Sequence, residues 1–340
     1  MHLINNTPFQ TLAVPTVCHQ DKNHLVIIVK ASFDIVAGSD VLSVSDEQQE
    51  ILLADKFWGE PDQSSLRYES DIALVKPGTD VAVIGSIYPD NPPVRVAEAV
   101  INVGSYRKTI RVSGDRYWAK GRVGYQISSP EPFDKMALVY ENAYGGQCLN
   151  ADSEMPSFDE RNPCGKGFID IKSKVIPEAL ALPNLENPQQ LISDIKQQPD
   201  PWCCGFVSRA WAPRKNFTGT YDEDWLKNRN PLLPVDFDIN VNNAASAGLI
   251  VKPYLQGGEL VQLENLSPQG RISFHLPTID LKTETSVKAE RNQHQMVMDT
   301  LVIEPDKARV SLTWRTSRQV NWNLSMIEWI KIGWQQRGHH

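Results

Sequence analysis

Short runs of apolar and β-branched residues at both ends of the chain, with no helical stretch between them, constrain the fold most. The run His24–Val36 is too poor in helix formers to be a helix. Val94–Val103 alternates apolar and polar residues, and Tyr106–Val112 repeats the alternation after Gly104, which predicts a hairpin. Strands that follow one another without helices favour antiparallel sheets over parallel βαβ units. The sequence therefore predicts a mainly β fold with an antiparallel β-sandwich or barrel-like body.

Other segments extend the strand pattern along the chain, and turns separate them. Lys76–Gly78, the tripeptide Lys-Pro-Gly, is a strong turn signal because proline fixes φ and glycine frees it. Further strands are expected on both sides of that turn and again after residue 258, at Asp71–Val75, Asp80–Tyr88, Gly270–Leu276, Gln295–Ile303, Ala308–Trp314 and Met326–Ile332.

The stretch from Tyr140 to Asp238 is dense in Gly, Pro, Trp, Tyr and Arg, without a run typical of disorder. Short helices are expected at 188–198 and 221–228, the second because the acidic run Asp222–Asp224 suits the positive end of a helix. A long loop-rich stretch that is ordered is usually functional. We expect three parts of one body, namely β-rich residues 1–134, an ordered loop-rich section 135–260, and β-rich residues 261–334.

Composition argues against several classes of partner. The chain of 340 residues carries a net charge of −7, whereas nucleic acids and anionic membranes require a concentrated basic face. We therefore expect neither a nucleic acid nor a membrane as a partner. No apolar run reaches the roughly 18 residues of a transmembrane helix, and no signal peptide is recognisable. The five cysteines are odd in number and scattered, which fits reduced thiols in the cytoplasm.

One segment shares two residues with a phosphate-binding loop. Asn162–Gly167 contains Gly165 and Lys166, but a phosphate loop needs Gly at position 160 and Ser or Thr at position 167. Glu160 and Gly167 occupy those positions. The segment is therefore expected to form a tight surface turn, and no cofactor is predicted.

Metal and catalytic motifs are also incomplete. Cys18, His19 and His24 lie close in sequence without a second ligand pair, and the adjacent Cys203 and Cys204 cannot easily share one tetrahedral zinc. No Gly-x-Ser-x-Gly elbow occurs. We predict no metal and no enzyme activity, with the cysteines packed in the interior.

Two further groups have simple structural explanations. His275 and His294 fall in expected strands or at their edges. The carboxylates of Asp222–Asp224 could in principle serve glycoside hydrolysis, but a solvated helix start explains them more simply.

Aromatic and arginine side chains in the middle of the chain are the best candidates for a binding surface. Flat aromatics bury area at low entropic cost, and Arg forks pair with carboxylates. Alternatively, each of them could order the loops from inside, with Arg stacked on Trp and Tyr. The candidate partner-binding residues are Trp58, Tyr140, Tyr144, Arg209, Trp211, Arg214, Tyr221, Trp225 and Arg229.

Several motifs follow one another in order over most of the chain. They are Trp58–Asp62, Ser65–Asp71, Lys76–Asp80, Tyr140–Gly146, Asn162–Gly167, Leu182–Leu185, Arg209–Arg214, Thr220–Asp222, Leu233–Phe237 and Leu263–Gly270. With these motifs the chain resembles the bacterial family called domain of unknown function 2169.

This resemblance implies an adaptor or chaperone of type VI secretion. Such a protein binds, in the cytoplasm, a toxic effector with a PAAR- or Rhs-type region, and helps to load it onto the VgrG spike, which is a further expected partner. Binding a client in its unassembled state shifts the client's folding or solubility equilibrium by mass action. The family supplies no catalytic residues to carry over.

Two other classes of function remain open at this point. A carbohydrate-binding or carbohydrate-active β-sandwich would also expose Trp and Tyr, because these side chains stack on sugars. A purely structural component would assemble with itself. A concave groove lined by Trp with paired carboxylates would favour the sugar, whereas buried aromatics under a broad or edge surface would favour an adaptor.

Overall fold

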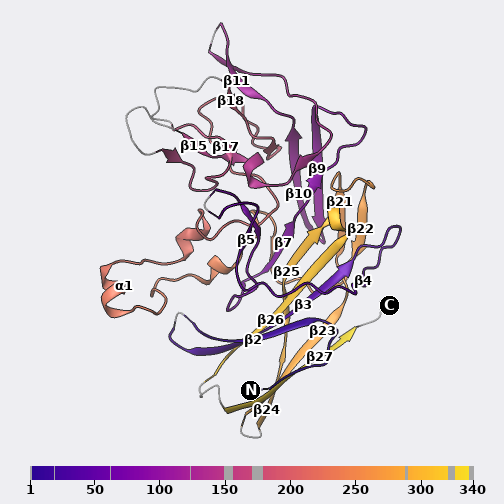
Figure 1. The fold of residues 1–340 in the computed structure, drawn as a ribbon, viewed down its shortest axis with the longest axis vertical. Coiled ribbons are helices and arrows are strands. Elements are labelled where there is room, and N and C mark those ends of the chain that lie inside the picture. Colours follow the sequence, from indigo (N-terminus) through magenta and orange to yellow (C-terminus); the bar gives the residue numbers. More distant parts are fainter. Residues whose placement is uncertain are drawn as a thin grey trace.

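The computed structural model describes residues 2–18, 20–61, 63–122, 124–148, 156–170, 179–287, 290–320 and 326–336. Within them the chain is mainly β, as the sequence predicted, and its sheets pack into a sandwich-like body with short helices and long loops (Figure 1).

The largest sheet has seven strands and draws on both ends of the chain. Six of them follow the order β2 (Gln10–Val17), β3 (Asn23–Asp34), β26 (Arg309–Gln319), β25 (Val297–Glu304), β7 (Thr79–Val83) and β20 (Ile250–Val251), and β4 (Ser43–Val44) pairs with β3. Neighbours are antiparallel except β25 and β7, which are parallel. Strands from the first, middle and last parts of the chain thus share one sheet, and the division at residues 134 and 260 stays a prediction.

Two further sheets complete the body. One has the order β19 (Leu185–Glu186), β10 (Tyr106–Ser113), β9 (Val96–Val103), β21 (Leu260–Glu264) and β22 (Ile272–His275). The other has the order β1 (His2–Asn5), β27 (Ile327–Gln336), β23 (Ile279–Val287) and β24 (Glu290–Gln295). The hairpin that the sequence predicted around Gly104 is the pair β9–β10, with Tyr106 opposite Val103.

Smaller strands and helices lie in the connecting segments. A three-stranded sheet has the order β12 (Tyr125–Ile127), β11 (Tyr117–Lys120) and β18 (Leu180–Ala181). Four strand pairs are β8 (Ser86–Ile87) with β13 (Met136–Ala137), β14 (Tyr144–Gly145) with β17 (Lys166–Gly167), β15 (Gln147–Cys148) with β16 (Ser157–Phe158), and β5 (Lys56–Phe57) with β6 (Leu66–Tyr68). The helices are α1 (Glu223–Asn228) and the 3-10 turns η1 (Tyr140–Asn142), η2 (Arg214–Phe217), η3 (Ile239–Asn242) and η4 (Pro305–Lys307).

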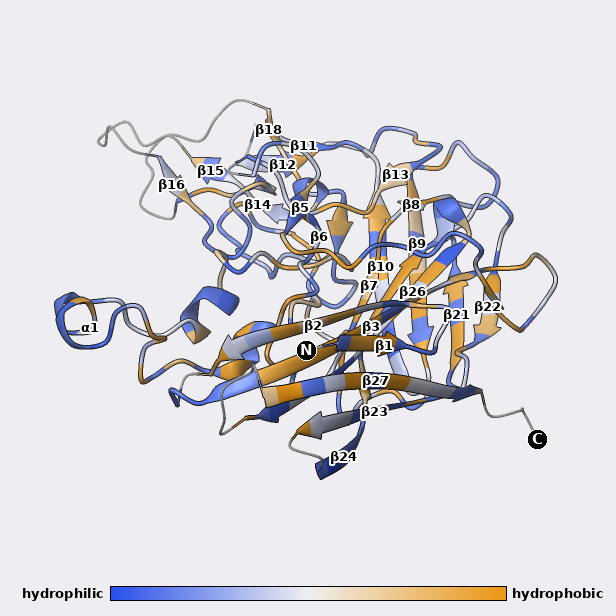
Figure 2. Ribbon diagram, turned by 60° about the horizontal axis from the view of Figure 1, so that its bottom comes forward, coloured by the Kyte–Doolittle hydropathy of each residue, from blue (hydrophilic) through white to orange (hydrophobic). Residues whose placement is uncertain are grey.

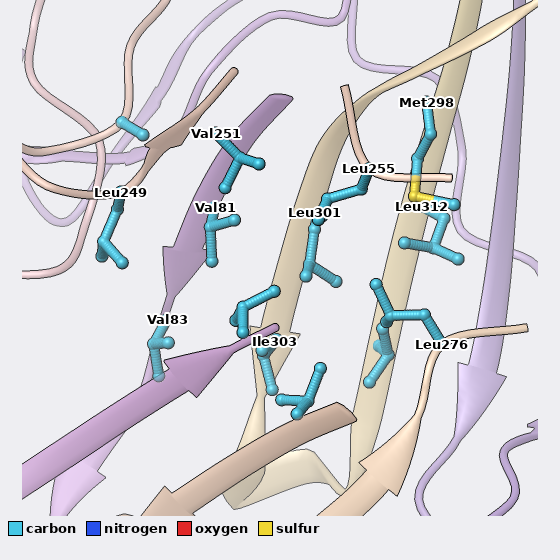
Figure 3. Close-up of a cluster of buried hydrophobic side chains, with 14 of the residues drawn as sticks. Val81, Val83, Leu249, Val251, Leu255, Leu276, Met298, Leu301, Ile303 and Leu312 are labelled. Carbon is cyan, nitrogen blue, oxygen red and sulfur yellow. The ribbon is translucent and has the colours of Figure 1, made fainter. Parts of the chain in front are cut away.

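The main hydrophobic core lies on one face of the seven-stranded sheet. Figure 3 shows Val81, Leu301 and Leu312, from three neighbouring strands, inside this buried cluster. Ile101 of β9 and Ile330 of β27 belong to the same cluster and are fully buried. Figure 2 shows the corresponding hydrophobic colour along β3, β10 and β26. The core therefore joins the seven-stranded sheet to both other large sheets, as in a sandwich.

The two expected helices had different outcomes. The helix expected at 221–228 is confirmed as α1, whose N-cap Asp222 accepts a hydrogen bond from the Trp225 N–H at 2.8 Å. The helix expected at 188–198 is wrong, because the segment consists of turns. There the Glu186 carboxylate accepts the Ile192 N–H, and Asp194 accepts the N–H two residues further on. Side chains thus take backbone donors that a helix would use.

The expected strand at Asp71–Val75 is also wrong. This segment is a loop whose carbonyl oxygens at Asp71 and Ala73 accept hydrogen bonds from Arg315 instead of from a neighbouring strand. Apolar residues in a short run can thus belong to a covered loop as readily as to a strand.

Candidate functional site

A loop from Phe217 to Asp238, called the arm below, projects from the body and carries α1 (Figures 1 and 2). The Asp238 N–H donates to the Phe217 carbonyl at 2.9 Å and so closes the base of the arm. Trp225 organises the interior, because its indole Nε1 donates to the Leu232 carbonyl at 2.8 Å and Tyr221 packs edge-on against its ring. The arm is therefore ordered by its own contacts.

The arm is tied to the hairpin between β2 and β3 by one arginine. Arg229 forms a two-pronged ion pair with Asp21, with Nη1–Oδ2 at 3.0 Å and Nη2–Oδ1 at 2.8 Å. Its Nε donates to the Leu233 carbonyl. A bidentate pair of this kind fixes orientation as well as distance. The arm and the hairpin are thereby held as one unit.

The outer surface of the arm exposes large apolar side chains. The exposed fractions are 53% for Tyr221, 60% for Leu226 and 80% for Val235. Single exposed hydrophobic residues are common on proteins, but a group of them on a projecting loop is typical of an interaction surface.

A groove runs between the base of the arm and the outer face of β2 and β3. Its cavity has a volume of about 160 Å³ and mostly apolar walls. Of the side chains that line the groove, Arg209 alone carries a charge, and a hydrogen bond of 3.4 Å joins its Nη2 to Asn242 Oδ1. The lining residues are Val14, Thr16, Val17, Val26, Ile28, Ile72, Ala73, Leu74, Arg209, Leu233, Phe237 and Asn242.

Beside the groove, the same face of the sheet holds buried ion pairs. The Lys76 ammonium lies 2.8 Å from carboxylate oxygens of both Asp80 and Glu69, and Arg214 forms a second ion pair with Glu69. Burial alone would lower the pKa of Lys76, but the carboxylates of Asp80 and Glu69 outweigh it and raise that pKa. These charges are therefore paired where solvent is excluded.

A second set of ion pairs fixes one wall of the groove. Arg315, which is 1% exposed, places Nε 2.5 Å from Asp299 Oδ2 and donates from Nη1 to the carbonyl oxygens of Asp71 and Ala73. The Asp71 carboxylate in turn pairs with Lys30 at 2.7 Å. Segment 71–74 is thus held in place by side chains from the sheet beneath it.

These buried charges, called the ionic layer below, are four cations and four anions. They are Lys30, Glu69, Asp71, Lys76, Asp80, Arg214, Asp299 and Arg315. A buried ion is costly unless it is paired and hydrogen-bonded, so the layer requires its partners together.

Another buried lysine, Lys108, is held by an aromatic ring and by neutral oxygen atoms. Lys108 packs its ammonium 4.1 Å from the centre of the Trp202 ring and donates to Ser246 Oγ at 3.0 Å and to the Ala247 carbonyl at 2.7 Å. Burial lowers the pKa of Lys108 to about 8, although the neighbouring thiols of Cys204 and Cys203 oppose this shift. This lysine supports the packing from inside the body.

Four of the nine candidate residues are buried and belong to the scaffold. Tyr140 and Trp211 pack edge-on with their ring centres 5.6 Å apart, and they are 3% and 7% exposed. Tyr144 is 2% exposed. Arg214 donates to the carbonyl oxygens of Val207 and Val241, and it also pairs with Glu69 of the ionic layer. For these four, burial agrees with the alternative that they order the loops.

The other five candidates lie at the surface or half-buried. Arg209 lies at the groove, while Tyr221, Trp225 and Arg229 belong to the arm. Trp58 is 38% exposed and stacks with the guanidinium of Arg67, whose carbon lies 4.4 Å from the ring centre. It does not line the groove. The structure thus brings together four of the nine residues at the arm and the groove.

The apolar walls of the groove were not among the candidates. Val14 and Val17 come from β2, whereas Leu233 and Phe237 come from the arm. A signal for β2 exists in the sequence, because β-branched residues in Gln10–Val17 surround Pro15, and proline within a strand marks a sheet edge.

A turn forms at Asn162–Gly167 as expected, because the Gly165 N–H donates to the Asn162 carbonyl at 3.3 Å, but its residues are buried or half-buried rather than open to solvent. Asn162 is fully buried, and its amide Nδ2 donates to the carbonyl oxygens of Tyr140 at 2.7 Å and Tyr144 at 2.9 Å. A Cβ at Gly165 would lie 2.4 Å from that amide nitrogen, so the position requires glycine. Asn162 thus ties the turn to the carbonyl oxygens of Tyr140 and Tyr144, next to the pairing of β14 with β17.

In the part of the chain that the structure describes, no group of three or more His, Cys, Asp or Glu side chains could hold a metal ion, and His19 lies outside that part. Over the same residues, helices long and apolar enough to cross a membrane are absent. Cys18, Cys164, Cys203 and Cys204 carry free thiols.

Comparison with known protein families assigns the chain to one of them. The family described as "Uncharacterized protein conserved in bacteria (DUF2169)" matches residues 20–315, and the chain belongs to this family. Searches of curated proteins and of solved structures found no match. The motifs Ser65–Asp71, Lys76–Asp80 and Arg209–Arg214, which carry the resemblance, supply most of the ionic layer.

Proposed function

We propose that this protein is a polypeptide-binding adaptor of type VI secretion. It binds an effector with a PAAR- or Rhs-type region in the cytoplasm, shields that region, and helps to load it onto the VgrG spike. The observation that carries the proposal is the apolar groove beside an arm that exposes Tyr221, Leu226 and Val235. The type VI part of the proposal rests on the resemblance given in the sequence analysis, and the family that matches the chain is bacterial.

The placement of aromatic side chains favours a polypeptide over a sugar. The lining of the groove contains neither a Trp nor a carboxylate. Tyr140, Tyr144 and Trp211 are buried beneath the surface. A sugar site would instead combine exposed aromatic faces with polar groups, and glycoside cleavage would require two carboxylates across the bond. The adaptor proposed here works through binding alone.

Reversible binding of a client is also favoured when the apolar surface is held rigid by buried residues beneath it. A preorganised surface loses little conformational entropy on association. The arm is held by Arg229 and Asp21, and the groove wall by Arg315, before any client arrives. Affinity can then come from apolar area that is already in position.

The test is co-purification with the PAAR- or Rhs-type effector encoded beside this protein. We expect the effector to co-purify with the tagged protein and to be more soluble and abundant in its presence. Leu226→Glu on the arm should abolish co-purification. Leu53→Glu is the matched control, because Leu53 is 71% exposed outside the arm and the groove. An effector that is equally soluble, abundant and secreted without this protein would refute the proposal.

A further inference from the structure

Strand β2 forms an edge of the seven-stranded sheet, with β3 as its neighbour. The Cys18 N–H donates to the Lys22 carbonyl at 3.0 Å, directly after the last pair of the β2–β3 ladder, Val17 with Asn23. In an antiparallel pair, residues alternate between bonding to the neighbour and facing away from it. The even-numbered residues of β2 therefore bond to β3, and the odd-numbered ones face outward.

The outward side of β2 carries free hydrogen-bonding groups. The N–H groups of Thr11, Ala13 and Val17 point away from β3, together with the carbonyl oxygens of the same residues and of Pro15. No hydrogen bond joins these groups to any residue among those the structure describes. The position of Pro15 agrees with this alternation. Proline has no N–H to give to β3, and in an edge strand its nitrogen faces away from the neighbouring strand.

Other edges of the three large sheets are short, covered or polar. β22 is covered, since the His275 N–H donates to the Asp40 carbonyl at 2.8 Å. β24 has the polar sequence Glu-Arg-Asn-Gln-His-Gln. β1, β19 and β20 have four, two and two residues, whereas β2 has eight. A long, apolar strand with a free edge can pair with other chains and cause aggregation, so proteins normally protect such edges. Its presence in this protein therefore indicates that the edge binds a partner.

The groove lies on the face of the sheet beside this free edge. Val14 and Thr16 line it from β2, opposite Val26 and His24 of β3 in the ladder. A strand added to β2 would place every second side chain on this same face. Those side chains would reach the apolar walls that the arm supplies with Leu233 and Phe237.

We propose that β2 accepts an extended segment of the client as an additional strand, with alternate apolar side chains directed toward the groove and a carboxylate beside Arg209. This inference rests on the adaptor function proposed above. Main-chain hydrogen bonds to Thr11 and Ala13 supply affinity, and the groove supplies specificity, as in other cases of strand addition.

Charge favours a client over a second copy of this chain. The groove holds one cation, Arg209, without an anion among its lining residues. In a dimer formed through this edge, β2 of the second copy would be the added strand. Its sequence, Gln-Thr-Leu-Ala-Val-Pro-Thr-Val, contains no carboxylate. A client segment with Asp or Glu at the matching position is the better partner.

The test removes one outward donor while leaving the ladder to β3 intact. Ala13→Pro eliminates the Ala13 N–H and blocks the edge, whereas Ala13→Val keeps the N–H and is the control. With the purified N-terminal region of the neighbouring effector as the probe, Ala13→Pro should raise Kd about tenfold or more. Arg209→Gln should raise Kd about fivefold, and Arg209→Lys by less.

Hydrogen–deuterium exchange on the wild-type complex supplies a readout that side-chain contacts alone would not produce. The Thr11 and Ala13 amides should exchange more slowly when the effector region is bound, because they become hydrogen-bonded. Binding without this protection, and with equal affinity for Ala13→Pro, overturns strand addition and leaves the adaptor function standing. No binding overturns both. A wild-type dimer that Ala13→Pro dissociates would assign the edge to a second copy.

Discussion

The ionic layer and the arm each hold an arginine against a carboxylate, but the layer is buried whereas the arm extends into solvent. In the layer, Arg214 and Arg315 are 4% and 1% exposed and each meets a carboxylate. On the arm, Arg229 also meets a carboxylate, but Tyr221 and Leu226 extend into solvent. A buried pair stabilises the fold only as a complete set, whereas an exposed apolar group contributes little to stability and is available for binding.

The difference predicts that variants of the layer and variants of the arm affect different quantities. Changes in the layer that leave the hold of Arg315 on segment 71–74 in place should lower the free energy of unfolding, and client binding by the folded fraction should persist. Changes to the exposed apolar side chains of the arm should leave stability almost unchanged and abolish binding. The variants below test this separation, from the largest expected effect to the smallest.

Breaking one ion pair of the layer should have the largest effect. Asp299→Ala leaves the Arg315 guanidinium buried without its carboxylate, which should cost about 3–5 kcal/mol of unfolding free energy. Urea unfolding followed by tryptophan fluorescence measures this. The double variant Asp299→Leu with Arg315→Met replaces the pair by apolar side chains and should recover much of the loss. If the single variant is as stable as the wild type, the ionic layer does not support the fold.

The two buried lysines should differ in their pH dependence. The pKa of Lys108 is about 8 in the folded protein, below its ordinary value, whereas that of Lys76 is raised. Between pH 8 and about 10.5 the unfolded chain then binds more protons than the folded one at Lys108, so stability rises with pH. The rise is on the order of 3 kcal/mol and should disappear in Lys108→Met.

The control for this prediction is the difference between wild type and Lys108→Met at each pH, since other groups titrate in both proteins. Unfolding midpoints in urea at pH 7, 8, 9 and 10 provide the measurement. A rise of equal size in both proteins would show that Lys108 is not the group responsible.

The link between the arm and the hairpin should contribute about 1 kcal/mol or less, because the side chain of Asp21 is 44% exposed. Arg229→Ala should nevertheless loosen the arm, so that amides of α1 exchange faster while those of β9 do not. Arg229→Lys keeps the charge but loses the two-pronged geometry of the guanidinium. Its α1 amides should therefore exchange at a rate between those of the wild type and of Arg229→Ala. Unchanged exchange in α1 would mean that the arm is ordered by Trp225 and its neighbours alone.

The exposed apolar residues should matter least to stability. Leu226→Glu and Val235→Glu should each change the unfolding free energy by at most about 0.5 kcal/mol, as expected for surface positions. Thermal unfolding measures this, with Leu53→Glu as the matched exposed site. A loss of several kcal/mol would place these side chains in the scaffold and remove the contrast with the ionic layer.

Local patterns in the sequence predicted much of the fold. The alternation in Val94–Val103 and Tyr106–Val112 predicted β9 and β10, and Asp222 predicted the start of α1, because these signals depend on neighbours in sequence. The helix at 188–198 failed because side chains take its backbone donors.

The groove could not be predicted in the same way. Its walls bring together Val14, segment 72–74, Arg209 and Leu233, which are far apart in the chain. Composition named Tyr140, Trp211 and Tyr221 as equivalent candidates, yet only Tyr221 is exposed. Whether an aromatic side chain is buried or exposed depends on tertiary packing. The residues next to it in the sequence do not determine this.

Site-specific photocrosslinking in bacteria that produce the neighbouring effector tests the central claim most directly. A photoreactive amino acid at Val235, which is 80% exposed on the arm, should crosslink to the effector. The same amino acid at Leu53, which is 71% exposed elsewhere, should not. Equal crosslinking at both positions, or a crosslink at Leu53 alone, would contradict the proposal that the arm and its groove hold the client.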